Sequence, residues 1–270
     1  PESFAPDNNY VIGESPEVKN FFVAAGFNSS GIAAAAGAGR AIAEWAVEGH
    51  PTMDLSDVDI RRFHKFQNGS NYLRDRVTEG LGLLYATHWP NRQPETARGA
   101  RRSPLHDRLA EQGACFGTVA GWERANWYGA SGIESKYEYS WHRQNWFEYS
   151  AEEHRAVREK VGLFDQTSFA KFLMEGQDAT SVLQNLCANN IDVKSGRVIY
   201  TAMLNRLGGI EADLTVTRCT QNSYLIVTGA ASATRDFTWI NQHIPSQAKA
   251  LLTDISSSYS AVGLIGPQSR

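Results

Sequence analysis

Two stretches of the sequence combine residue types that could do chemistry. The first is GFNSSG, from Gly26 to Gly31, which stands directly before an alanine-rich run. A helix that begins there would direct unpaired N–H groups and the positive end of its dipole at a neighbouring group. That arrangement suits a phosphate or the electron-rich edge of a reduced flavin, and an ordinary capped turn explains the same residue types equally well.

The second stretch is YTAMLNRLGGIEADLTVTR, from Tyr200 to Arg218. Asp213 has mainly apolar neighbours here, and burying a lone carboxylate is costly, so we expect it to be hydrogen-bonded, paired or functional. The alternatives are an Asp in water at the end of a strand, or an ion pair with Arg218. Tyr200 precedes the intervening hairpin and could face the same side as Asp213.

The elements around the first stretch form a strand, a turn and a helix. The apolar run FFVAA predicts a short buried strand, and residues 32–47 predict a helix that ends at Gly49 and Pro51. The dinucleotide fingerprint G-x-G-x-x-G is absent from the 270 residues. Because a doubly wound domain needs several such units, we expect most of it to lie upstream of Pro1.

The middle of the chain connects two regions. Residues 56–80 are charged and have a helical pattern, in which RRFHKF is interpreted as a solvated helix face. Residues 90–103 are rich in proline and arginine and are interpreted as an exposed linker.

Residues 103–270 have a different sequence pattern from the residues before them. GWERANWYG is aromatic and irregular, and a serine-capped amphipathic helix is expected to begin at Ser150. The runs AKFLMEG, RVIYTAMLN, ADLTVTR and SYLIVTG predict strands, with a helix between the first two and a hairpin turn on Gly208 and Gly209. These patterns indicate an α+β region with antiparallel strands after an α/β segment.

Composition limits the classes of function. Lys plus Arg is 26 against 29 Asp plus Glu, a formal net charge of -3, so nucleic acid is not expected as a partner. Three widely spaced cysteines favour a reducing compartment, and neither they nor the histidines have the spacing of a metal site. The uncharged stretch from Asn20 to Gly39 contains glycines and polar residues and favours a buried turn and helix over a membrane span.

Longer motifs resemble a known family in their order along the chain. Residues 1–45 resemble the C-terminal end of the flavin domain of sarcosine dehydrogenase, dimethylglycine dehydrogenase and the regulatory subunit of pyruvate dehydrogenase phosphatase. DVDIRRF and residues 101–128 resemble the connecting segment of these proteins. VGLFDQTSFAKFLMEGQDATSVLQNLCANN, YTAMLNRLGGIEADLTVTR and GLIGPQSR resemble the first half of the folate-binding aminomethyltransferase (glycine cleavage T-protein) domain.

The resemblance implies two cofactors, FAD and tetrahydrofolate. Family members oxidise an N-methyl group to an iminium species, pass electrons to an acceptor and transfer the one-carbon unit to tetrahydrofolate. The residues implied to close over the flavin are Gly26, Phe27, Asn28, Ser29, Ser30, Gly31 and Ile32. Asp213 matches the folate-site aspartate and would act catalytically, Tyr200 matches a pterin-side tyrosine, and Phe169 matches an apolar folate contact.

The resemblance also predicts the domain organisation. Residues 1–55 would be the C-terminal end of the FAD-dependent oxidoreductase domain. Residues 56–102 would form a connecting helical segment, and residues 103–270 would be the N-terminal part of the aminomethyltransferase-like folate-binding domain. Both sites would need the rest of a longer polypeptide, which would lie in the mitochondrial matrix of a eukaryote or the cytoplasm of a bacterium.

Thr228 and Gly229 depart from the family pattern, because many T-proteins carry an asparagine there. Sarcosine or dimethylglycine would be the substrate; a catalytically silent regulatory subunit and an isolated folate-binding module are the alternatives.

Overall fold

A computed structural model describes residues 2–270; Pro1, the first residue of the expected flavin segment, lies outside the described residues. The chain forms two compact units by contact. The first unit runs to Leu73 and resumes over Phe169–Ser256, and the second contains Arg74–Ser168 and Ser257–Arg270. Each unit is therefore built from two stretches that are distant in the sequence.

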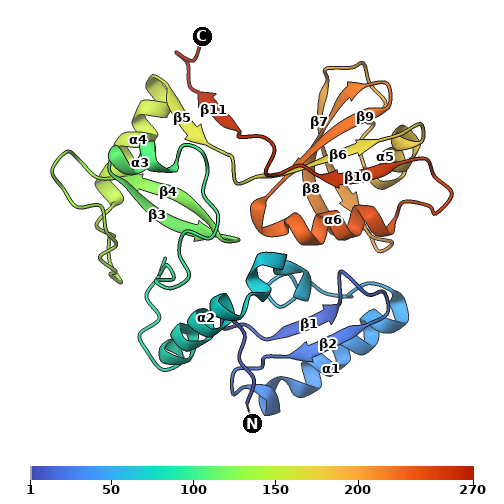
Figure 1. Cartoon of the computed structure of the whole chain (residues 1–270), viewed down its shortest axis with the longest axis horizontal. Helices are drawn as coiled ribbons and strands as arrows, with labels where there is room; N and C mark the ends of the chain where they lie inside the picture. The colour runs from blue at the N-terminus through green and yellow to red at the C-terminus, as the bar shows by residue number, and fades with distance from the viewer. Residues whose placement is uncertain (1) are drawn as a thin grey trace. The chain divides into compact units, whose positions relative to one another are not determined.

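The N-terminal part of the first unit is a small antiparallel ribbon packed on one long helix (Figure 1). Strands β1 (Val11–Glu14) and β2 (Phe22–Ala25) pair, and α1 (Gly31–Glu48) follows the GFNSSG turn. Gly49 ends α1 in the left-handed conformation at φ 80°, where its N–H donates to the Trp45 carbonyl. The predicted strand, turn and helix are all present here, but the prediction that they are buried was wrong for β2, which has no buried residue, and for most of α1, whose buried residues are Ala38, Ala41 and Trp45.

The segment after α1 differs from its prediction. In place of a helix from residue 56, the chain forms two short 3-10 turns, η1 (Ile60–Arg62) and η2 (Lys65–Asn68), before α2 (Ser70–Leu83). Asp59 causes the early turn, since its carboxylate accepts a hydrogen bond from the Arg61 backbone N–H at 2.8 Å. Arg61 is buried, so the prediction of a solvated helix face was wrong at this residue.

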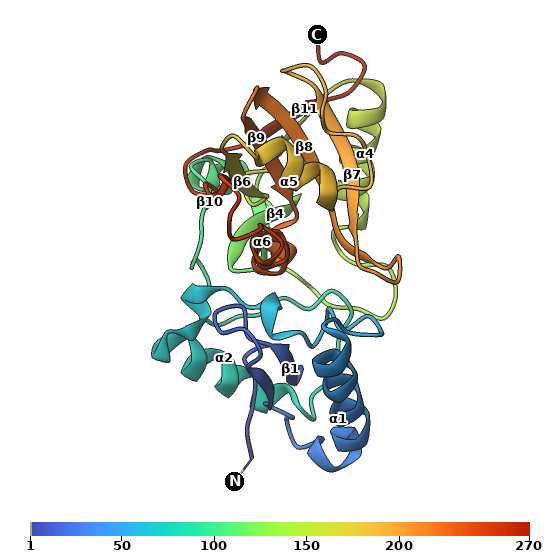
Figure 2. The same cartoon turned by 90° about the vertical axis from the view of Figure 1, so that its right-hand side faces the viewer.

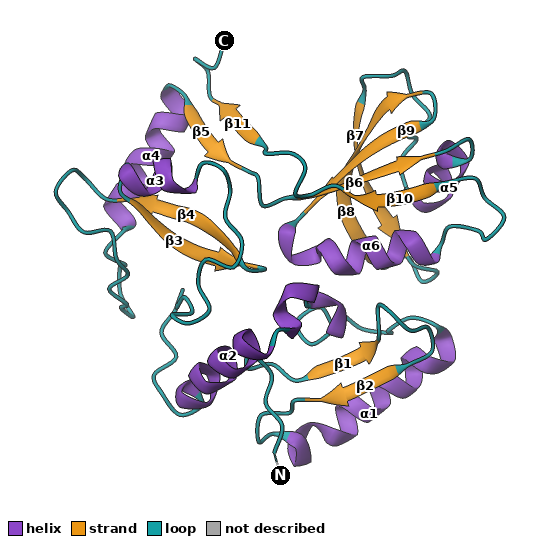
Figure 3. Ribbon diagram, in the orientation of Figure 1, coloured by secondary structure: helices purple, strands orange, loops and turns teal. Residues whose placement is uncertain are grey.

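The rest of the first unit is a five-stranded antiparallel sheet with the order β10-β6-β9-β8-β7 (Figure 3). The strands are β6 (Ala170–Glu175), β7 (Val198–Leu204), β8 (Ile210–Thr220), β9 (Ser223–Thr228) and β10 (Leu251–Asp254). The first four match the predicted runs, and β7 and β8 are joined by the predicted hairpin. A bulge interrupts the pairing of β7 and β8 between Met203 and Leu204.

Alternation along these strands gives the sheet one closed face and one open face. Ala212, Leu214 and Val216 of β8 are buried against α5 (Ala179–Leu186) and α6 (Ala233–Gln242), together with Ile240. η3 (Ala230–Ser232) leads into α6. On the opposite face, Asp213 and Tyr200 are exposed. In both views α6 lies between the sheet and the N-terminal ribbon (Figures 1 and 2).

Among the described residues, the second unit holds two antiparallel strand pairs and two helices besides most of α2. The pairs are β3 (Ala114–Val119) with β4 (Trp122–Tyr128), and β5 (Gly162–Asp165) with β11 (Val262–Ile265). The helices with most of their contacts to these strands are α3 (His106–Glu111) and α4 (Phe147–Glu159). Two predictions were wrong here: GWERANWYG contains the regular strand β4, and α4 begins three residues before Ser150, with Trp146 as its N-cap.

Candidate functional site

The GFNSSG turn has an unusual backbone. Gly26, Asn28 and Ser29 have φ angles of 66°, 49° and 67°. These angles lie in the left-handed region, which residues other than glycine rarely adopt. Such strain is kept only where the surrounding structure fixes it. The turn is therefore a defined shape, not a loose connection.

Hydrogen bonds from the first residues of the chain hold this shape. The side-chain oxygen of Asn28, which is buried, accepts from the Ala5 N–H at 2.9 Å, and the Asn28 N–H donates to the Ser3 carbonyl at 3.1 Å. Ser3 Oγ accepts from the Gly26 N–H at 3.0 Å. Phe27 stacks on Tyr10 with ring centroids 5.0 Å apart.

The turn presents the start of α1 to its surroundings. Ser30 is the N-cap and, within the described chain, makes no side-chain capping bond, so the first N–H groups of the helix remain available. Ile32 in the first turn is fully exposed. Of the seven residues predicted to contact a flavin, Ser29, Ser30 and Ile32 are exposed, whereas Gly26 and Asn28 are buried within the turn.

The open face of the sheet brings Tyr200 and Asp213 together. β7 and β8 pair so that Ala202 is opposite Asp213 and Tyr200 is opposite Thr215, which places the two side chains on a diagonal of the same face. A hydrogen bond from Tyr200 to Asp213, together with the charge of that carboxylate, raises the pKa of the Tyr200 phenol. The prediction that they face the same side is confirmed.

Asp213 is hydrogen-bonded, as expected, but it lies in water in the middle of β8 and not in an apolar setting. Asp213 is exposed, because its neighbours Ala212 and Leu214 point to the closed face. Arg218 pairs with Asp192 at 2.5 Å, and no bond between Arg218 and Asp213 occurs among the described residues. The reason is alternation, which puts Arg218 and Asp213 on opposite faces.

Phe169 stands directly before β6, two positions from β8 in the strand order, and is about one-third exposed. Thr228, at the unusual position in the family pattern, is buried and donates to Asp236 at 2.5 Å. An open groove of about 620 Å³ lies elsewhere, lined by Asp192, Val193, Lys194, Arg197 and Arg218. None of the predicted site residues in the described chain lines it.

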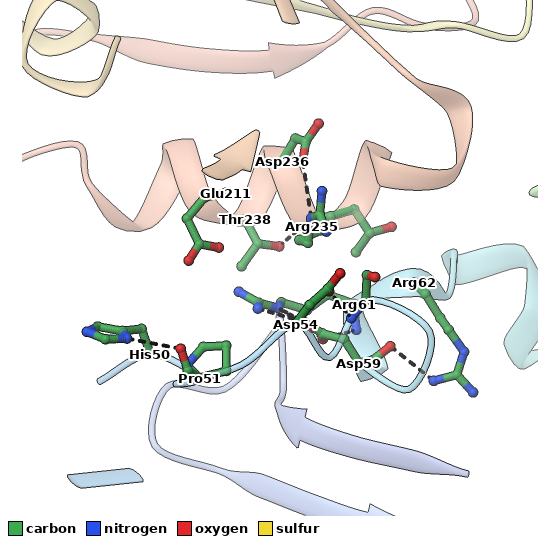
Figure 4. Close-up of polar contacts among 12 residues, drawn as sticks. His50, Pro51, Asp54, Asp59, Arg61, Arg62, Glu211, Arg235, Asp236 and Thr238 are labelled. Atoms are coloured by element: carbon green, nitrogen blue, oxygen red, sulfur yellow. Dashed lines mark hydrogen bonds and ion pairs between the residues drawn. The ribbon is translucent and has the colours of Figure 1, made fainter. Parts of the chain in front are cut away.

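A buried polar cluster that no sequence pattern predicts lies where the N-terminal segment meets α6 (Figure 4). Asp59 and Arg61 form an ion pair at 2.7 Å with almost no exposure. Asp236 is also buried; burial raises its pKa to about 6, against the opposing effects of the Thr228 hydrogen bond and the charges of Arg235 and Arg61. Charged residues in a turn and a helix are ordinarily exposed to water, so the burial of this cluster is seen only in the tertiary structure.

Residues 2–270 contain neither a cluster of metal-ligating side chains nor a membrane-spanning helix. In this part of the chain no three side chains of the metal-ligating types gather closely enough to hold an ion. No described helix has both the length and the apolar content needed to cross a bilayer.

The chain thus combines a strand, turn and helix segment with an antiparallel sheet that helices cover on one face. Family models match in this order: FAD dependent oxidoreductase over residues 1–45, FAD dependent oxidoreductase central domain over residues 48–103, and GCVT N-terminal domain over residues 105–270. The glycine cleavage system aminomethyltransferase T from Bartonella henselae shares the fold with a TM-score of 0.52 at 24% identity, covering 63% of this chain and 42% of that one.

Curated relatives narrow the class. The chain is 49% identical to 4-methylaminobutanoate oxidase (formaldehyde-forming) of Paenarthrobacter nicotinovorans, over 100% of this chain and 33% of that protein. It is 35% identical to the mitochondrial pyruvate dehydrogenase phosphatase regulatory subunit of Mus musculus, over 99% of this chain and 31% of that protein, and 32% identical to the mitochondrial sarcosine dehydrogenase of Homo sapiens, over 100% and 34%. The chain thus spans about a third of the length of these relatives. It belongs to the sarcosine and dimethylglycine dehydrogenase family, in which the end of an FAD-dependent oxidoreductase domain is followed by a GCVT N-terminal domain.

Proposed function

We propose that the chain is part of a flavin- and folate-dependent enzyme that oxidatively demethylates an N-methylated amino acid. The observation that carries the proposal is the pair Tyr200 and Asp213 on the open sheet face of a chain that also bears the strained Gly26–Gly31 turn. Sarcosine and dimethylglycine are the proposed substrates from the family, and the name of the 49% identical relative adds 4-methylaminobutanoate.

The Gly26–Gly31 turn would form one wall of the flavin site. FAD, when bound, supplies the acceptor for the two electrons that leave the N-methyl group. The residues of the turn fit a group that becomes anionic, because unpaired N–H groups at the start of α1 can stabilise negative charge. Ile32 is fully exposed in this chain, so its apolar side chain would be free to cover the flavin ring.

The open sheet face would bind tetrahydrofolate. Asp213 would place a carboxylate beside the reacting pterin nitrogens, where it could stabilise developing positive charge or relay a proton, and the Tyr200 hydroxyl fixes its orientation. Phe169 would contribute an apolar contact from the start of β6. The one-carbon unit would then pass to tetrahydrofolate, and the demethylated amine would leave.

The test uses the full-length polypeptide, with each of the three amines added anaerobically while the flavin absorbance is followed. We expect bleaching by at least one of them; no reduction by any of the three would refute the proposal. Oxygen consumption in the same preparation distinguishes an oxidase from a dehydrogenase that needs a separate electron-transfer acceptor.

The role of Asp213 is tested separately. Asp213→Ala should leave amine oxidation largely intact and increase the free formaldehyde released. An unchanged yield of methylenetetrahydrofolate would remove Asp213 from the folate site.

A regulatory subunit of a phosphatase is the second candidate, supported by 35% identity to a protein of that name over nearly the whole chain. Copurification with a phosphatase catalytic subunit, combined with the absence of amine oxidation, would favour it.

The third candidate is an isolated folate-binding module, which the proposed two-part site argues against. Calorimetric titration of this chain with tetrahydrofolate should show weak binding or none, and micromolar affinity would favour this candidate. In a eukaryote we propose the mitochondrial matrix as the location, as the names of the mammalian relatives suggest.

A further inference from the structure

The buried pair of Asp59 and Arg61 has no part in either proposed site. Arg61 donates from Nε and Nη2 to both carboxylate oxygens of Asp59 at 2.7 to 3.1 Å. Its guanidinium lies 4.8 Å from the ring centroid of Trp45, which is itself buried in α1. Asp59 is bridged to Ile12 of β1. The pair is thus anchored to the segment that carries the Gly26–Gly31 turn.

The other side of the pair is α6. η1, which contains Arg61, packs against α6 and η3. Thr238 lies on the side of α6 that faces the loop carrying Asp54 and Arg61 (Figure 4) and is buried, while Arg235 pairs with Asp236 of the same helix at 3.5 Å. Hydrogen bonds from Ser56 are the main reason that the pKa of Asp54 is low, and the charge of Arg235 lowers it further.

The position of α6 determines the position of the open face. α6 packs on the closed face of the sheet through the buried Ile240, so the sheet that carries Tyr200 and Asp213 moves with the helix. A buried ion pair adds little net stability compared with apolar residues of the same size, but it can select one arrangement among several. Arg61 lies in η1, which packs against α6, so its ion pair with Asp59 is placed to select one arrangement of α6 relative to the N-terminal segment.

We propose that Arg61 is a positioning residue that holds the sheet bearing Tyr200 and Asp213 at a fixed place relative to the segment bearing the Gly26–Gly31 turn. This inference rests on the proposed function, because the one-carbon unit made at the flavin must reach the folate face. If the separation varies, water adds to the iminium carbon instead, and the products are free formaldehyde and the demethylated amine.

Arg61→Met in the full-length polypeptide tests the proposal, since methionine retains an unbranched apolar stem and removes the charge. We expect flavin reduction within about twofold of the wild type and a share of free formaldehyde about threefold higher or more. Arg61→Lys keeps the charge and loses the bidentate geometry, so its share of free formaldehyde should lie between those of the wild type and Arg61→Met. The control is Arg40→Met, because Arg40 makes an ion pair with Glu44 on the exposed side of α1. An unchanged share of formaldehyde in both Arg61 variants would overturn the proposal.

Hydrogen exchange of the 270-residue chain gives a readout that does not depend on enzyme activity. Arg61→Met should speed exchange of the α6 amides by about tenfold and leave β8 and β9 unchanged. Unchanged exchange in α6 would overturn the positioning role whatever the enzyme assays show. Conversely, a wild-type protein that oxidises none of the amines refutes the proposed function, and the exchange result still decides the role of Arg61.

Discussion

The Thr228 hydroxyl donates a hydrogen bond to the carboxylate of Asp236 at 2.5 Å, and both side chains are buried between β9 and α6. Thr228 and Gly229 are the two positions where the family resemblance leads us to expect an asparagine, and the Thr228 contact is directed to the helix that follows. This bond lowers the pKa of Asp236, but burial, the largest effect, raises it to about 6. The carboxylate therefore titrates close to neutral pH.

Asp236→Asn should remove a pH dependence of stability. The pKa is raised in the folded chain, so the stability that Asp236 contributes is complete below its ordinary pKa of 3.8 and is lost as the pH rises through about 6. The variant should match the wild type near pH 4 and be more stable by roughly 3 kcal/mol near pH 7.5. Urea unfolding across this range measures the difference, with the exposed Asp57→Asn as control. A difference that does not vary with pH would contradict the assignment.

Glu123→Gln should destabilise the second unit. Arg98 donates to both oxygens of the Glu123 carboxylate, at 2.9 and 2.5 Å, and the Gly99 N–H donates to one of them at 2.6 Å. Burial raises the pKa of Glu123, but these bonds outweigh it and the pKa is lowered overall. Because an amide cannot accept from both Arg98 nitrogens in the same way, we expect a loss of about 2 kcal/mol at pH 7.

The same pair predicts an acid-dependent effect. Since the pKa of Glu123 is lowered, its contribution to stability is present above the ordinary pKa of 4.5 and is lost as the pH falls through the folded value. Glu134→Gln is the matched control, because Glu134 pairs with Lys136 on the surface, where water and salt screen the pair, so the change in stability should be much smaller than at Glu123. Equal losses in the two variants would exclude a special role for the Arg98 bonds.

Tyr200→Phe should weaken folate binding without affecting folding. Tyr200 is 67% exposed, so the removal of its hydroxyl leaves the core unchanged. The lost bond to Asp213 frees that carboxylate to rotate, and we expect tetrahydrofolate to bind the full-length polypeptide about fivefold more weakly. Calorimetric titration checks this, with Tyr259→Phe as an exposed control. Unchanged affinity would separate Tyr200 from the folate site.

Local pattern was sufficient to predict four of the five strands of the sheet, β6 to β9, but not β10. The alternation of Ala212, Leu214 and Val216 fixes the closed face of β8, and paired glycines fix the β7–β8 hairpin, so the shared face of Tyr200 and Asp213 follows from sequence. The sequence left open whether Asp213 is buried or in water, because its apolar neighbours along the strand point to the other face of the sheet.

Tertiary contacts explain the predictions that failed. Nothing local distinguishes Arg61 from a solvated arginine; its burial depends on Asp59, Trp45 and a helix more than 170 residues later. In β4, closely spaced tryptophans hid the strand pattern, which became visible only through pairing with β3. The arginine-rich connection likewise contains Arg98, whose partner Glu123 lies in β4.

Gly176→Ala and Gly37→Ala should have opposite effects on stability. Gly176 follows β6 with φ 133°, and a Cβ there would lie 2.1 Å from the Lys249 carbonyl oxygen, so the backbone before β10 would have to move. We expect a loss of more than about 3 kcal/mol, or failure to fold. Gly37 lies inside α1 with open space around its Cβ position, and alanine there should add about 0.5 to 1 kcal/mol by restricting the unfolded chain. Chemical denaturation of the 270-residue chain compares the two, and a tolerated Gly176→Ala would show that the β6–β10 connection is less tightly packed than described.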